Sequence, residues 1–180
     1  MIVSHVKGNI LDVGCGAGRM VMHYQKMGYD ITGIDNSPLA IEVCQKRGCQ
    51  KVKLMDIFNT DLPPFSFDTL LLFGHNIGIG GTLSGAMALL YSLRNLAKPG
   101  AVLLLTTMDV DKTKQKDHLA YQEKIQKAGR YRGEIRIRVE YKDEIGDWFP
   151  WLHLDTSVLA RLARKTGWRF VELYESKAGD

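Results

Sequence analysis

The sequence predicts an α/β fold with a doubly wound, mostly parallel sheet. Short apolar stretches alternate with helix-like patterns over residues 9–107, and each stretch has the length of a buried strand. Near the start of the chain, a strand, a glycine-rich loop and a helix follow one another over residues 9–27. This alternation favours parallel strands that are joined by right-handed crossovers.

The apolar stretches that read as parallel strands are residues 9–13, 29–34, 52–55, 67–73 and 101–107. The helix after the glycine loop places four apolar side chains on one face, those of Met20, Val21, Tyr24 and Met27. Ser37 and Pro38 are typical of an N-cap and a first helical position, and Gly48 is typical of the end of that helix. A helix is also expected at residues 83–97, ended by Lys98-Pro-Gly100.

The most informative stretch is Ile10-Leu-Asp-Val-Gly-Cys-Gly-Ala-Gly-Arg19. Its three alternating glycines permit positive φ and let a ligand lie against the backbone. A dinucleotide fingerprint needs glycine at the sixth position of its motif, where this chain has Arg19. Asp12 stands two residues before the first glycine. The stretch predicts a nucleotide-binding corner of another type, with a plain strand-to-helix turn as the alternative.

Two further acids close the next two strands. Asp35 follows the second strand, about twenty residues past the glycine loop, where a carboxylate can accept both hydroxyls of a ribose. The alternative for Asp35 is a helix cap, a task for which Ser37 is already present. Asp56 follows the third strand and is a candidate for the amino group of an adenine ring. Carboxylates gathered at one sheet edge would repel one another unless a cation or hydrogen-bond donors joined them.

These stretches together resemble the class I S-adenosylmethionine-dependent methyltransferases. Residues 12–18, 33–37 and 54–57 resemble motifs I, II and III, and residues 67–76 resemble the strand and loop of motif IV. The resemblance implies a Rossmann-like fold that binds S-adenosyl-L-methionine at the carboxyl ends of its strands and releases S-adenosyl-L-homocysteine. The cofactor contacts that it implies are Asp12, Gly14, Cys15, Gly16, Asp35, Asn36, Asp56, Ile57, Gly74 and Asn76.

The loop Gly74-His-Asn-Ile77 disfavours both kinds of nucleic-acid methyltransferase. It lacks the Asp/Asn-Pro-Pro-Tyr/Phe of the exocyclic-amine enzymes, and no cysteine nucleophile of the cytosine-C5 type follows Cys49. His75 is the candidate catalytic residue, as a general base for a protonated acceptor. Alternatively, its ring packs under the methionine part of the cofactor.

Residues 109–153 interrupt the alternation and are expected to form an inserted lid or acceptor-site segment. Residues 112–142 hold ten Lys and Arg against four Asp and Glu, which would suit an anionic acceptor. A helix at residues 112–128 and a half-buried strand at residues 133–142 are expected. Candidate walls of the acceptor pocket are His118, Tyr121, Trp148 and Trp151. The alternative is that these aromatic side chains fill a core.

The expected organisation is one domain in three parts: a cofactor-binding core at residues 1–108, the inserted segment, and a completing part at residues 154–180. That last part should hold a helix at residues 156–166, capped by Gly167, and a sixth strand at residues 168–174. The final antiparallel strand of the family sheet has no counterpart after Glu175, so we expect it to be missing or replaced by the strand near residues 134–141. An uncovered sheet edge would favour a homodimer.

Composition limits the remaining choices. The 180 residues are 45% hydrophobic, with no apolar run near the roughly 20 residues that span a bilayer. The absence of a basic-apolar leader and three cysteines without CxxC spacing predict a cytoplasmic protein without a zinc site, and no metal is expected. A net charge of +4 is too small to indicate a nucleic acid.

We therefore expect methyl transfer to a small-molecule acceptor. A non-catalytic binding protein and, less favoured, a nicotinamide-dependent oxidoreductase remain as alternatives.

Overall fold

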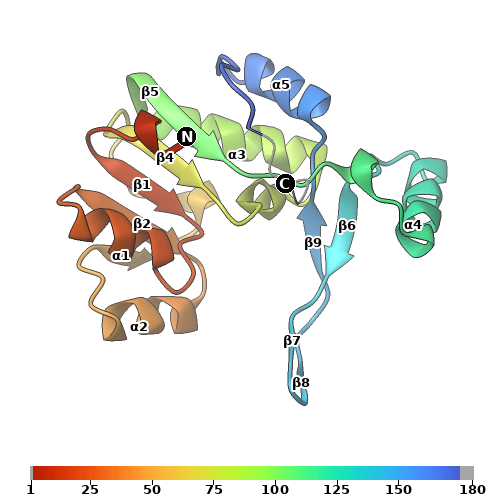
Figure 1. Ribbon diagram of the computed structural model, residues 1–180, viewed down its shortest axis with the longest axis horizontal. Helices are drawn as coiled ribbons and strands as arrows, with labels where there is room; N and C mark the ends of the chain where they lie inside the picture. The colour runs from red at the N-terminus through yellow and green to blue at the C-terminus, as the bar shows by residue number, and fades with distance from the viewer. Residues whose placement is uncertain (1, 175–180) are drawn as a thin grey trace. The chain divides into compact units, whose positions relative to one another are not determined.

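The computed structural model describes residues 2–174 and confirms the predicted α/β fold with flanking helices (Figure 1). The chain forms two structural units. The first contains the residues up to 76 together with 91–106, and the second contains 77–90 and the residues from 107 onward. Each unit is described by itself below.

A five-stranded parallel sheet forms the first unit, in the order β3-β2-β1-β4-β5. Its strands are β1 (Ile10–Val13), β2 (Ile31–Asp35), β3 (Val52–Leu54), β4 (Phe67–Leu72) and β5 (Ala97–Leu105). All four residues of β1 are buried, and β4 is buried except for one residue. Continuous burial of this kind is typical of central strands that are covered on both faces. The register aligns Asp12 with Gly33 and Asp35 with Leu54.

The α-helices of this unit begin and end close to where the sequence places them, and two short 3₁₀ helices that the sequence analysis does not predict are present as well. The elements are η1 (Ile2–His5), α1 (Arg19–Lys26), α2 (Pro38–Lys46), η2 (Ile57–Asn59) and the second half of α3 (Leu83–Leu96). The Ser37 hydroxyl accepts a hydrogen bond from the Ala40 amide at 3.3 Å, which confirms the predicted N-cap of α2. On α1, Val21 and Tyr24 are buried as expected. Met27 is 57% exposed, so the prediction that it shares this buried face is wrong, because α1 ends at Lys26.

Strand β5 begins four residues before the expected position. Lys98-Pro-Gly100 lies inside it, although these residues were expected to end α3 and precede the strand. The pairing of β4 with β5 shifts register between Phe67 and Thr69. Proline is tolerated at a sheet edge or an irregularity because its missing N–H interrupts no pairing there. Within residues 2–174, β5 is paired only with β4.

The second unit holds the elements that follow the parallel sheet. They are η3 (Asn76–Gly80, from residue 77), the first half of α3, η4 (Val110–Lys112), α4 (Lys116–Lys127) and α5 (Thr156–Lys165), together with four short strands. The strands β6 (Glu134–Ile137) and β9 (Phe149–Leu152) pair antiparallel, and β7 (Glu140–Tyr141) and β8 (Glu144–Ile145) form the hairpin that extends from them (Figure 1). Helix α5 buries Val158, Leu159, Leu162 and Ala163.

Four expectations for this unit are corrected. The single strand at residues 133–142 is two short strands, and β6 pairs with β9 rather than with β5, because the aromatic stretch Phe149–Leu152 is itself a strand. The helix expected at residues 112–128 begins at Lys116. No strand forms at residues 168–174: this segment pairs with no strand of the described chain, and Val171 is 73% exposed.

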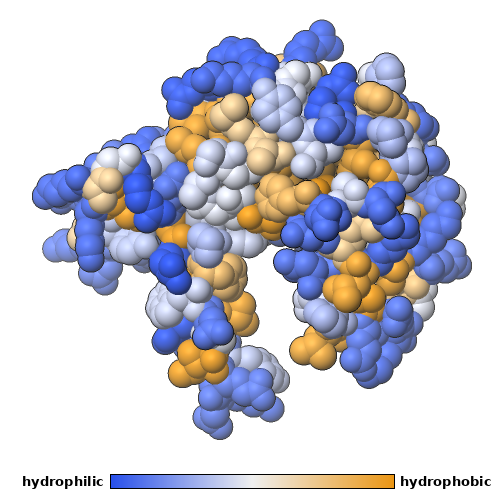
Figure 2. All heavy atoms as spheres, turned by 180° about the vertical axis from the view of Figure 1, so that it is seen from behind, coloured by the Kyte–Doolittle hydropathy of each residue, from blue (hydrophilic) through white to orange (hydrophobic). Residues whose placement is uncertain are grey.

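The surface of the extended hairpin carries apolar side chains, visible as orange spheres on the projecting arm in Figure 2. Val139 and Ile145 are 66% and 63% exposed there. Among the described helices, none has the length and apolar character needed to span a membrane.

Candidate active site

The glycine loop between β1 and α1 is built on backbone conformations that favour glycine. Gly14, Gly16 and Gly18 have φ angles of 70°, 53° and 76°, in the left-handed region. The Gly14 and Cys15 amides both donate to the Ile34 carbonyl, at 2.9 and 3.0 Å, and tie the loop to β2. A Cβ added to Gly16 would meet no atom within 4 Å, so the backbone here is open to a ligand.

Asp35, the last residue of β2, fixes this loop through its carboxylate. Oδ2 accepts a hydrogen bond from the Gly16 amide at 2.8 Å, and Oδ1 accepts one from the Ser37 amide at 2.9 Å. A carboxylate has about four acceptor positions, so two amides leave it able to accept further donors. The side chain is half-buried. Asp35 therefore presents a fixed, partly open carboxylate beside the glycine loop.

Asp12 lies under the loop, inside β1, and is only 3% exposed. Its Oδ2 has no hydrogen-bond partner in the part of the chain that is described. Burial raises the pKa of this carboxyl to about 7; Arg19 opposes the shift, and the Asp35 charge adds to it. The structure thus brings Asp12 and Asp35 within electrostatic range of one another, as the sequence predicts.

Asn76, in the loop after β4, contacts the end of β1 and the start of the glycine loop. Its Nδ2 donates to the carbonyls of Val13 and Gly14, both at 2.9 Å. The sequence suggests a ligand contact for Asn76 but gives no sign of this bridge between two loops. The side-chain oxygen stays an acceptor, since neither of these bonds uses it.

His75 and Gly74 take up an unusual backbone conformation before Asn76. Their φ angles are 62° and 73°, and the His75 amide donates to the Thr106 hydroxyl at 3.0 Å. Non-glycine residues in the left-handed region are uncommon and are concentrated at functional sites. Nδ1 of the His75 ring is buried. The two roles considered for His75 both remain predictions.

Cys15 belongs to the glycine loop, and the other two cysteines of the chain, Cys44 and Cys49, contact it. All three are buried and free, and the Cys44 thiol donates to the Gly16 carbonyl at 3.0 Å. Burial raises the pKa of Cys15 and of Cys49, which keeps both as neutral thiols. A Cβ on Gly18 would lie 2.5 Å from the Cys49 sulfur, so the thiols fill the space behind the loop.

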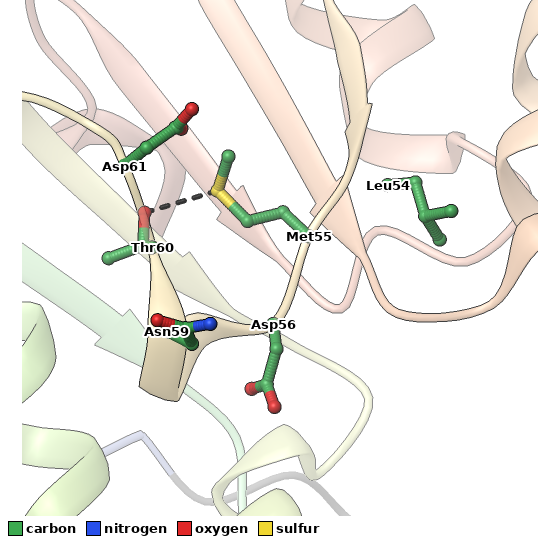
Figure 3. Close-up of a pocket in the computed structure, with 6 residues that line it drawn as sticks. All are labelled: Leu54, Met55, Asp56, Asn59, Thr60 and Asp61. Carbon is green, nitrogen blue, oxygen red and sulfur yellow. Dashed lines mark hydrogen bonds between the residues drawn. The ribbon is translucent and has the colours of Figure 1, made fainter.

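The third acid, Asp56, lies two residues after the end of β3. Its Oδ1 accepts from the Phe58 amide at 2.9 Å and caps η2. It lines a pocket of about 420 Å³ after β3, whose other lining residues are Leu54, Met55, Asn59, Thr60 and Asp61. In Figure 3, Asp56 points away from the pair formed by Met55 and Thr60, which a 3.1 Å hydrogen bond joins.

Two other predicted cofactor contacts differ in their exposure. The side chain of Asn36 is exposed. Ile57 is only 4% exposed, so little of its side chain is open to a ligand ring.

The four candidate acceptor residues lie in the second unit, two of them on α4 and two in or next to β9. His118 and Tyr121 are exposed on α4, where Nδ1 of His118 lies 3.1 Å from the Thr113 hydroxyl. Trp148 is 53% exposed, with the Arg138 guanidinium 4.9 Å from its ring centroid. Trp151 is half-buried in β9, edge-to-face with Phe149. Their role as a pocket wall stays a prediction.

Comparison with known proteins identifies the family. The sequence pattern of the family described as "Methyltransferase domain" matches residues 10–100, which is half of the chain and includes the glycine loop, Asp35, Asp56 and Asn76. The chain belongs to this family. The predicted resemblance to the class I S-adenosylmethionine-dependent methyltransferases is confirmed.

Similar proteins agree with this assignment. A crystal structure of a SAM-dependent methyltransferase from Bacteroides fragilis, in complex with S-adenosyl-L-homocysteine, superimposes with a TM-score of 0.80 at 29% identity, over 97% of this chain and 70% of that one. A ubiquinone biosynthesis O-methyltransferase from Cereibacter sphaeroides is 28% identical over 56% of this chain and 41% of its own length. A malonyl-[acyl-carrier protein] O-methyltransferase from Salmonella typhimurium is 28% identical over 56% of this chain and 39% of its own length. The chain thus spans about two fifths of these curated relatives.

Proposed function

We propose that the chain binds S-adenosyl-L-methionine and transfers its methyl group to a small-molecule acceptor. The observation that carries this proposal is the set of Asp12, the glycine loop and Asp35 in the first unit. They combine an open backbone, a half-exposed carboxylate and a buried acid at the carboxyl ends of neighbouring parallel strands. Membership of the methyltransferase family supports the same conclusion and does not favour either alternative, a non-catalytic binding protein or a nicotinamide-dependent oxidoreductase.

The residues present fit such a cofactor. Asp35 keeps acceptor capacity for ribose hydroxyls after its two amide bonds. The buried Oδ2 of Asp12 lacks a donor among residues 2–174, and its ionised form would be favoured by the positive sulfonium and ammonium groups. We assign Gly14, Cys15, Gly16 and Gly74 to the backbone wall of this site, and Asn36, Asp56 and Ile57 to the adenine side.

When bound, S-adenosyl-L-methionine supplies a methyl group on a sulfonium, which is already a good leaving group. The chain's own contribution is then to hold the acceptor in line with the methyl carbon and to exclude water. His75 would take a proton only from an acceptor that is protonated at neutral pH.

We further propose that the acceptor is held by the segment after β5, through His118, Tyr121, Trp148 or Trp151. The excess of Lys and Arg over residues 112–142 supports an anionic acceptor. The two curated relatives are both named O-methyltransferases, which supports an oxygen nucleophile. Three buried free thiols support a reducing, cytoplasmic location, and the unpaired outer edge of β5 within residues 2–174 supports a homodimer.

Calorimetric titration tests the cofactor proposal. We expect micromolar binding of S-adenosyl-L-methionine and S-adenosyl-L-homocysteine, and none of NAD or NADP. Asp35→Ala should weaken the sulfur nucleosides by at least about tenfold, because it removes a charged acceptor and releases the Gly16 amide. Asp30→Ala is the matched control, since Asp30 precedes the same strand and pairs with Lys51 on the surface. Binding of NAD, or no binding by the folded chain, would contradict the proposal.

A further inference from the structure

The C-terminal end of helix α2 lies against the glycine loop, and a turn at Gly48 fixes its shape. The Gly48 amide donates to the Gln45 carbonyl at 3.0 Å. The Cys49 amide donates to the Cys44 carbonyl, also at 3.0 Å. With Gly48 at a φ of 85°, these two bonds form a Schellman motif, which folds the chain back onto the last turn of the helix. The thiols of Cys44 and Cys49 therefore meet behind Gly18, where an added Cβ would lie 2.9 Å and 2.5 Å from their sulfurs.

Three side chains from this end of α2 donate to three successive carbonyls of the glycine loop. All the residues involved belong to the first unit, and each donor is 28 to 31 residues away from its acceptor in the sequence. The guanidinium is the strongest of the three donors because it is charged, whereas thiols are weak donors. The contacts are Cys44 Sγ to the Gly16 oxygen at 3.0 Å, Arg47 Nη1 to the Ala17 oxygen at 2.6 Å, and Cys49 Sγ to the Gly18 oxygen at 3.9 Å.

These contacts fix Gly16, the residue whose backbone is open to a ligand, from both sides. Its amide donates to Asp35 Oδ2 at 2.8 Å, and its carbonyl accepts from the Cys44 thiol. The peptide bonds of residues 2–174 are all trans, so the N–H of a peptide unit points opposite to its C=O. Because the Gly16 carbonyl is directed at α2, the Ala17 amide points away from it. The loop is thus ordered before a ligand binds, which reduces the entropy that binding would otherwise lose.

We propose that Cys44 and Arg47 are positioning residues for cofactor binding: they fix the carbonyls of the glycine loop, so that cofactor affinity depends on the C-terminal end of α2. Neither side chain is among the cofactor contacts assigned above, and both act through the loop backbone. Cys44 is fully buried, whereas Arg47 is exposed. The inference rests on the proposed function and extends it to a second layer of residues.

Calorimetric titration of variants with S-adenosyl-L-homocysteine tests the proposal. Arg47→Ala should weaken binding about fivefold, because the loop must then be ordered by the ligand itself. Cys44→Ala should weaken it about threefold, whereas Cys44→Ser should stay within about twofold of the wild type, since a hydroxyl also donates. Lys46→Ala is the matched control, because Lys46 is the exposed neighbour of Arg47 and pairs only with Glu42 among the ion pairs of α2. It should keep the wild-type affinity.

The unliganded ¹⁵N-labelled protein provides a second measurement. The Gly18 amide shares a peptide unit with the Ala17 carbonyl, so its signal should shift in Arg47→Ala and stay in place in Lys46→Ala. Thermal unfolding separates positioning from a merely structural role. A structural role would lower the melting temperature of Arg47→Ala and leave the affinity of the folded protein unchanged.

Wild-type affinity in both Arg47→Ala and Cys44→Ala would overturn the positioning role while leaving cofactor binding intact. Equal weakening in Lys46→Ala, or an unmoved Gly18 amide in Arg47→Ala, would overturn it as well. Should Cys44→Ala not fold, the exposed position of Arg47 still allows the test. Failure of the wild type to bind S-adenosyl-L-homocysteine would instead contradict the proposed function.

Discussion

At the scale of single residues, Asp12 has an energetically unfavourable environment next to the glycine loop. It is a carboxyl group inside a central strand, with one oxygen that no donor satisfies in residues 2–174. Burying a charge without a partner is costly, so the carboxyl keeps its proton to an unusually high pH. A buried acid with an unsatisfied oxygen costs stability where it stands, near the end of an otherwise apolar strand, and this points to a functional rather than a structural role.

The raised pKa of Asp12 makes stability depend on pH. The folded carboxyl has a pKa of about 7 against an ordinary value of 3.8, so the folded state holds a proton that the unfolded state has lost. Asp12 therefore makes its full contribution to the free energy of unfolding below about pH 4. This contribution is lost as the pH rises through about 7. The total change is on the order of 4 kcal/mol at about 1.4 kcal/mol per pKa unit. In Asp12→Asn, which stays neutral, we expect this fall in the free energy of unfolding to be absent.

Urea unfolding of both proteins at pH 5 and pH 8 measures this difference. Equal pH dependence in wild type and Asp12→Asn would mean that Asp12 does not carry the effect.

The residue scale also shows what a sequence can and cannot predict about the site. The positions of Asp12, Asp35 and the three glycines follow from local spacing, because strand ends and tight turns have strong local signals. The bridge from Asn76 to Val13 and Gly14 spans more than 60 residues, and nothing near Asn76 in the sequence marks it. A long-range hydrogen bond of this kind needs the folded backbone to be recognised.

At the scale of elements, the parallel strands depend on close approach between helix and sheet. Gly33 in β2 is the clearest case. A Cβ there would lie 2.6 Å from Cγ2 of Val21 on α1 and 3.0 Å from the Cys15 sulfur. Its φ is outside the left-handed region, so contact and not backbone strain requires the glycine.

Gly33→Ala should therefore destabilise the fold by about 1–3 kcal/mol, the usual cost of overpacking a well-packed core. Combining it with Val21→Ala should recover part of that loss, because the second substitution removes the clashing methyl group. Thermal unfolding of the single and double variants measures both effects. If the stability loss of the double variant equals the sum of the losses of the two single variants, the two side chains do not clash and this packing account is wrong.

The elements that sequence reasoning missed share one physical cause. Residues 168–174 have the composition of a strand but pair with no strand in the described chain, so strand propensity alone does not form one. Conversely, Phe149–Leu152 contains a proline and two large aromatics, yet it pairs with β6 across four residues. The short antiparallel strands of the second unit depend on their partners, whereas the helices and most parallel strands of the first unit follow the local sequence pattern.

At the scale of the whole molecule, the residues proposed for the cofactor and those proposed for the acceptor fall in different units. The first unit holds Asp12, the glycine loop, Asp35 and Asn76. The second holds every residue proposed for the acceptor, and its sequence shows no motif that names a substrate. The family match ends at residue 100, so it covers the motifs of the first unit and none of the residues from 107 onward.

The measurement that tests this account most directly is an NMR titration of the ¹⁵N-labelled chain with S-adenosyl-L-homocysteine. We predict that the amide signals of Gly14, Gly16, Asn36 and Asp56 shift, because these residues surround the proposed site at the ends of β1, β2 and β3. The amides of Asp30 and Lys51, next to the other end of β2, should stay in place. Shifts at Asp30 and Lys51 without shifts in the glycine loop, or no shifts at all, would contradict the account.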